Sequence, residues 1–77
     1  MAKAIILINA DPGRDREVAG KIKSIEGVDN VYLAAGRFDV VVEVQAPDDT
    51  SMLSLAYDKI RVISGIRETH TMFCLPV

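Results

Sequence analysis

The fold of this chain is decided by a stretch of sequence that occurs twice. Residues 21–28 read Lys-Ile-Lys-Ser-Ile-Glu-Gly-Val, and residues 59–66 read Lys-Ile-Arg-Val-Ile-Ser-Gly-Ile, 38 positions later. In each copy an amphipathic helix ends at a glycine, which tolerates the left-handed region, and a β-branched residue then opens a strand. Two copies of strand, turn, helix and strand predict the element order βαββαβ.

The remaining pattern predicts where the elements lie. Ala4–Ile8 is a continuous apolar run of strand length, which is typical of a strand buried on both faces. Val18, Ile22 and Ile25 form one stripe of a first helix. The expected strands are residues 4–8, 28–35, 39–45 and 66–75, and the expected first helix is residues 14–25.

A second helix is expected after Asp48, a residue type that caps helix N-termini. Its expected core stripe is Leu53, Ala56, Ile60 and Ile63. Right-handed crossovers then arrange the four strands as an antiparallel sheet with both helices on one face, the α+β ferredoxin-like fold.

This arrangement leaves the second face of the sheet without helices. The strands are nevertheless apolar on both sides. Residues 5–8 contain no polar residue, and Tyr32, Val41 and Met72 are further large side chains on the strands that need to be covered. A large exposed apolar face on a small domain marks an interface. We therefore expect a homo-oligomer in which the sheets of two protomers face each other across a two-fold axis.

Composition excludes several classes of protein. The 77 residues form one domain (1–77), and the single cysteine excludes a disulfide framework or a cysteine cluster for zinc. The net charge is −2 and the nine Lys and Arg residues are dispersed, so no basic stripe is available for direct nucleic-acid binding. No membrane span or signal peptide is recognisable, which predicts a cytoplasmic protein.

The sequence offers little for catalysis. His70 is the only histidine, and its alternation puts it on the side of its strand opposite to Thr69 and Thr71. No serine, cysteine or lysine is placed to form a nucleophile and base pair with it. Cys74 between two apolar residues is expected to be a small buried hydrophobe. We therefore expect no enzyme activity, no metal and no cofactor.

The residues also carry a resemblance to a known family. The chain resembles the effector domain of the Lrp/AsnC feast/famine transcriptional regulators, called the RAM domain, over essentially its whole length. The residues that carry it are 17–18, 25–28, Val31, the hairpin 36–40 with its Gly-x-aromatic-Asp pattern, and the strand 65–71 with its Gly-Ile-x-x-Thr-x-Thr pattern. The family's regulators have a helix-turn-helix domain before this module, whereas here Met1 leads directly into the first strand.

The resemblance implies a stand-alone effector module, a mode of assembly and a class of ligand. Members of the family dimerise through their sheets, assemble into rings such as octamers or decamers, and bind small amino acids between dimers. Partners would be further copies of the chain, an amino acid, and a full-length Lrp/AsnC regulator on which the module docks. The implied ligand-binding residues are Ala35, Gly36, Arg37, Phe38, Asp39, Thr69 and Thr71.

Each part of this site also has an ordinary structural explanation. A backbone hairpin can bind a carboxylate and Asp39 can pair with an ammonium group, but glycine and aspartate are equally typical of a simple hairpin turn. Thr69 and Thr71 place two hydroxyls about 7 Å apart on one face, yet threonine is a common strand residue. A tip charge such as Arg37 is usually solvated.

Two further functions remain open. An ACT-type regulatory domain has the same element order, binds amino acids at interfaces and usually has a glycine in the first loop, where this chain has Gly13. A small dimeric α+β barrel enzyme would need a histidine or an acid pointing into the cleft between sheet and helices. His70 is the only candidate for that role.

Overall fold

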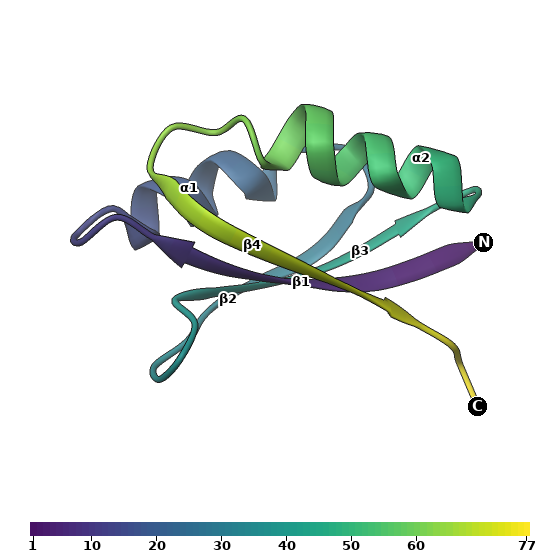
Figure 1. Ribbon diagram of the computed structural model, residues 1–77, viewed down its shortest axis with the longest axis horizontal. Helices are drawn as coiled ribbons and strands as arrows, with labels where there is room; N and C mark the ends of the chain where they lie inside the picture. Colours follow the sequence, from purple (N-terminus) through teal and green to yellow (C-terminus); the bar gives the residue numbers. More distant parts are fainter.

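The computed structural model describes all 77 residues as a four-stranded antiparallel sheet with helices on one side (Figure 1). The order of strands across the sheet is β2-β3-β1-β4. The elements along the chain are β1 (Ala2–Ala10), α1 (Asp15–Lys23), β2 (Val28–Leu33), β3 (Val40–Ala46), α2 (Asp49–Ser54), the π-helix η1 (Leu55–Ile60) that continues α2, and β4 (Ile66–Cys74). The predicted ferredoxin-like fold is confirmed.

The hydrophobic core lies between the two central strands and the helices. On β1 and β3, alternate residues face the helices, and the pairs Ile6–Val42 and Ile8–Val40 are fully buried. A strand places every second side chain on the same face, so the register of the strand pairing determines which residues of each strand are buried. The core residues are Ala4, Ile6, Ile8, Ala10, Val18, Ile22, Val40, Val42, Val44, Ala46, Met52, Leu55 and Ile60.

The opposite face of the sheet is uncovered in the single chain. Ile5 and Leu7 of β1 are only half-buried, and on the outer strands Tyr32 and Met72 are 52% and 47% exposed. The prediction that β1 is buried on both faces is therefore wrong for the chain by itself. The reason is that both crossover helices pack on the same side of the sheet, so one chain can cover only one face.

The start of the second helix is as predicted, but its core stripe is not. The side chain of Asp48 accepts a hydrogen bond from the backbone N–H of Ser51 at 2.7 Å, so Asp48 is the N-cap. Leu53, expected in the core, is 46% exposed, whereas Met52 is fully buried. The predicted stripe assumed a regular α-helix throughout.

The π-helical turn explains the shift of the stripe. The buried side chains of this helix are Met52, Leu55 and Ile60, so the last two are five residues apart instead of three or four. The amide of Arg61 donates to the carbonyl of Ala56 at 2.9 Å, a bond that also spans five residues. One extra residue in the turn thus keeps Ile60 in the core, while Ala56 and Ile63 pack at its margin.

The two repeated glycines lie in the turns after the helices, and the helices end earlier than predicted, α1 at Lys23 and η1 at Ile60. Gly27 and Gly65 have φ angles of +95° and +102°, in the region that favours glycine. A Cβ atom on Gly65 would lie 3.1 Å from the guanidinium carbon of Arg14 and 3.1 Å from Val18 Cγ2. The turn before β4 therefore needs glycine for its backbone angle and for its close packing against α1.

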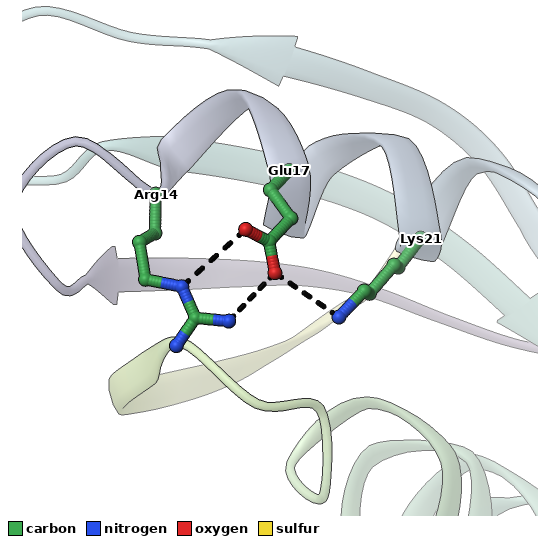
Figure 2. Close-up of polar contacts among 3 residues, drawn as sticks. All are labelled: Arg14, Glu17 and Lys21. Atoms are coloured by element: carbon green, nitrogen blue, oxygen red, sulfur yellow. Dashed lines mark hydrogen bonds and ion pairs between the residues drawn. The ribbon is translucent and has the colours of Figure 1, made fainter.

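An ion-pair network holds Arg14 in this position (Figure 2). The guanidinium of Arg14 donates to both carboxylate oxygens of Glu17, at 2.6 and 3.4 Å, and Lys21 Nζ lies 3.2 Å from the same carboxylate. Hydrogen bonds from Arg14 and then Lys21, with the charge of Arg14, lower the pKa of Glu17 to about 2. The network connects the start of α1 with its second turn and is structural.

Candidate functional site

The hairpin that contains five of the expected ligand-binding residues connects β2 to β3. Its base is the strand pair Leu33–Val40 and a hydrogen bond from the Ala34 amide to the Asp39 carbonyl at 2.9 Å. The tip of the hairpin is exposed, and Gly36 has a φ of +137°. Figure 1 shows this loop extending from the sheet on the side away from the helices. The tip can therefore offer backbone N–H groups to a molecule outside the chain.

Asp39 connects the hairpin to the central strand. Its backbone amide donates to the carbonyl of Ile8, and its carboxylate oxygen Oδ2 accepts a hydrogen bond from the amide of Ala10; both bonds are 2.9 Å long. Ala10 is the last residue of β1 and lies where the pairing with β4 shifts register. The half-buried carboxylate thus stands in for a backbone acceptor at the end of the strand. Asp39 has a structural role that the sequence did not reveal.

Aromatic contacts link the hairpin to β4 across the open face. The rings of Phe38 and His70 meet edge to face with their centroids 5.4 Å apart, and the guanidinium of Arg37 lies 6.0 Å from the Phe38 centroid. Nε2 of His70 lies 2.6 Å from Oε1 of Glu68. His70 pairs with Leu7 on the open face, so it does not point into the space between sheet and helices. The barrel-enzyme alternative, which needed it there, is not supported.

Thr69 and Thr71 lie on the other face of the sheet. They pair with Ile8 and Ile6, whose side chains are buried under the helices. Both threonines line a groove of about 630 Å³ between η1 and the edge strand β4. The other residues of this groove are Leu53, Ala56, Tyr57, Arg61, Ile66, Arg67 and Glu68.

The structure therefore does not bring all the expected site residues together in one chain. No hairpin residue lines the groove that contains the threonines, and the hairpin extends from the opposite side of the sheet. A single pocket formed by both groups would require residues from two copies of the chain. The proposed role of these seven residues stays a prediction.

The groove also contains residues that sequence reasoning missed. Arg61 and Tyr57 are four residues apart, and the guanidinium of Arg61 lies 5.0 Å from the centroid of the Tyr57 ring. The spacing of an arginine and an aromatic residue by four was a usable signal. Arg67 gave no such signal, because its position depends on the shift of register between β1 and β4.

The structure contains no group of three or more His, Cys, Asp or Glu side chains that could hold a metal ion. None of its helices combines the length and the apolar run needed to cross a bilayer. The regions considered as the candidate site are the hairpin, the groove and the open sheet face.

Comparison with known proteins identifies the family. The model of the Lrp/AsnC ligand-binding domain matches residues 3–76. The chain belongs to the Lrp/AsnC family. An HTH-type transcriptional regulator of Pyrococcus horikoshii is 40% identical over 72 residues, which are 90% of this chain and 48% of the relative. The HTH-type transcriptional regulator FL11 of Pyrococcus furiosus is 32% identical over 74 residues, 96% of this chain and 48% of the relative. This Lrp/AsnC domain thus spans about half the length of these relatives.

Solved structures of similar proteins share the fold. The structure of FFRP-DM1 superposes with a TM-score of 0.93 at 29% identity, covering 97% of this chain and all of that one. A feast or famine regulatory protein of M. tuberculosis complexed with L-methionine superposes with a TM-score of 0.84 at 23% identity, covering 100% of this chain and 52% of that one. The named relatives are transcriptional regulators, and the ACT alternative is disfavoured by the family match.

Proposed function

We propose that this Lrp/AsnC domain binds a small α-amino acid at an interface between copies of itself, and that binding changes its assembly or its docking on a full-length regulator of the same family. The observation that carries the proposal is the match of the whole domain to the family's ligand-binding domain. The complex of the M. tuberculosis relative with L-methionine supports an amino acid as the ligand class. The proposed role is regulatory and not catalytic.

The geometry of the hairpin fits the two charged ends of an amino acid. The exposed backbone at Gly36 and Arg37 can donate hydrogen bonds to a carboxylate. Asp39 lies next to it with one oxygen bonded to Ala10, which leaves its other oxygen for an ammonium group. Thr69 and Thr71, on the other side of the sheet, would come from a second copy.

The open sheet face supports an assembly of at least two chains. Ile5, Leu7 and Val41 form an apolar centre on this face that no element of the chain covers. Exposed apolar surface of this kind is typical of protein interfaces. A two-fold dimer that packs the sheets together would cover it, and dimers could then associate into a ring through the hairpins.

A screen for thermal stabilisation tests the proposal. The purified chain is mixed with each of the twenty amino acids, and a ligand at 100 times its dissociation constant should stabilise the folded state by about 2.7 kcal/mol. Sedimentation with and without the best ligand then tests whether binding changes the assembly. The absence of stabilisation by every amino acid, measured on a well-folded sample, would refute the proposal.

A further inference from the structure

The groove between η1 and β4 holds two arginines that no carboxylate neutralises. The chain's ion pairs are Arg14–Glu17, Lys21–Glu17 and His70–Glu68, so neither Arg61 nor Arg67 has an acidic partner. Glu68 also borders the groove, but its carboxylate is bound to His70 at 2.6 Å, and its pairing with Asn9 puts it on the open face. The groove is therefore locally positive in a chain whose net charge is −2.

Two backbone irregularities border this groove, and each positions one of the arginines. The π-helical turn η1 ends directly before Arg61, whose guanidinium is held over the Tyr57 ring. In β4, Ile66 pairs with Ala10 and Glu68 pairs with Asn9, so Arg67 is the extra residue of a β-bulge. Both π-turns and β-bulges are found frequently at functional sites, where they redirect side chains. Their occurrence on the two walls of one groove favours a binding function.

The rest of the lining defines the ligand. Leu53, Ala56 and Ile66 give one part of the groove an apolar surface, and the hydroxyls of Thr69 and Thr71 lie along β4. A volume of about 630 Å³ is within the usual range for small-molecule sites. Two guanidinium groups favour a carboxylate, because a planar fork can bind both of its oxygens. The one acidic residue at the border of the groove, Glu68, is placed on the open face by its pairing with Asn9, away from a ligand's ammonium group.

We propose that this groove binds a small monocarboxylate with an apolar tail and no ammonium group, a 2-oxo acid with a branched side chain being the fitting class. Arg61 and Arg67 bind the carboxylate, and Leu53 and Ile66 contact the tail. The site uses no residue of the hairpin. It therefore overlaps the amino-acid site proposed above only at Thr69 and Thr71, which border both.

A titration of the ¹⁵N-labelled full chain with 4-methyl-2-oxopentanoate tests this site. The amide signals of residues 56–57, Ile66, Arg67 and Thr69 should shift, while those of Gly36 and Phe38 should not. Arg61→Gln and Arg67→Gln should each weaken binding roughly tenfold or more, because a charge-assisted hydrogen bond is lost. Arg16→Gln, which removes an exposed arginine of α1 outside the groove, should bind like the parent.

Probe chemistry provides a second test that requires no substitution. The uncharged 4-methylpentanamide should shift the same signals much less at equal concentration, and L-leucine should bind the groove more weakly than the 2-oxo acid. Equal shifts with the amide, equal binding of leucine, unchanged affinity in both arginine variants, or no shift at millimolar acid would each overturn the proposal. Asp39→Asn separates the two sites, because it should impair amino-acid binding and leave this titration unchanged.

Discussion

Asp39 and Ala10 are joined by a hydrogen bond of 2.9 Å from the Ala10 amide to Oδ2 of the Asp39 carboxylate. This bond ties the hairpin to the end of the central strand, at the point where the pairing of β1 with β4 shifts register. The hairpin is thus held on a rigid element although its tip is exposed. Asp39 thus has a structural role beside the ligand-binding role proposed for it, and substitutions must separate the two.

Asp39→Ala should destabilise the fold. The amide of the buried Ala10 would lose its acceptor, and an unsatisfied buried amide costs about 1 to 3 kcal/mol. Asp39→Asn retains an acceptor oxygen and should cost clearly less, while still removing the charge that an ammonium group would need. Denaturant unfolding of both variants, compared with calorimetry of amino-acid binding, distinguishes the roles. Equal unfolding free energies of the alanine variant and the parent would show that the bond contributes nothing.

Glu17 should make stability depend on pH in acid. Its pKa is lowered in the folded state to about 2 by hydrogen bonds from Arg14 and Lys21, from an ordinary value of 4.5. Because the folded-state pKa is the lower one, this contribution is complete above about pH 4.5 and is lost as the pH falls towards 2. The difference in unfolding free energy between the parent and Glu17→Gln should shrink over this window.

Salt and a control variant test the same network. Because the three side chains are about half-exposed, added salt should reduce the contribution of Glu17 at neutral pH. Glu26→Gln removes an exposed glutamate outside the network and should show neither effect. A Glu17→Gln profile parallel to that of the parent from pH 5 to pH 2 would contradict the assignment.

The register of the second helix gives a direct comparison of neighbouring residues. Met52→Ala should cost about 2 to 5 kcal/mol, because it removes a fully buried side chain and leaves a cavity. Leu53→Ala should cost less than about 1 kcal/mol, because that residue is already 46% exposed. Chemical denaturation of the two variants measures both values. The opposite order would restore the regular α-helix expected from the sequence.

This comparison shows how far local pattern predicts the fold. The spacing of Val18 and Ile22, the N-cap Asp48 and the positive φ angles of Gly27 and Gly65 depend on a few neighbouring residues, and all were predicted correctly from the sequence. The π-turn was not, because its extra residue is selected by packing of Leu55 and Ile60 against a sheet that forms from distant strands. Tertiary contacts here override the local period.

The candidate site was predictable to a similar extent. Alternation correctly separated His70 from Thr69 and Thr71. The bond from Ala10 to Asp39 could not be inferred, since it joins residues 29 positions apart through a side chain. The position of Arg67 depends on a bulge between two strands at opposite ends of the sequence. Contacts that depend on the register between distant strands cannot be recognised from neighbouring residues in the sequence.

The open sheet face leads to a prediction about assembly. Leu7→Lys should leave the fold of the single chain intact, because the residue is only half-buried there and a lysine can keep its ammonium group in water while its stem packs on the sheet. In a dimer that packs two sheets together, the same charge would be buried without a partner, which costs several kcal/mol. Sedimentation should therefore show a dimer or larger ring for the parent and dissociation for Leu7→Lys, with an unchanged circular dichroism spectrum.

Val62→Lys is the control for this prediction. Val62 follows η1 and is 70% exposed, so this variant should assemble like the parent. A parent chain that sediments as a monomer at micromolar concentration, or a Leu7→Lys variant that assembles normally, would show that this face is not the interface.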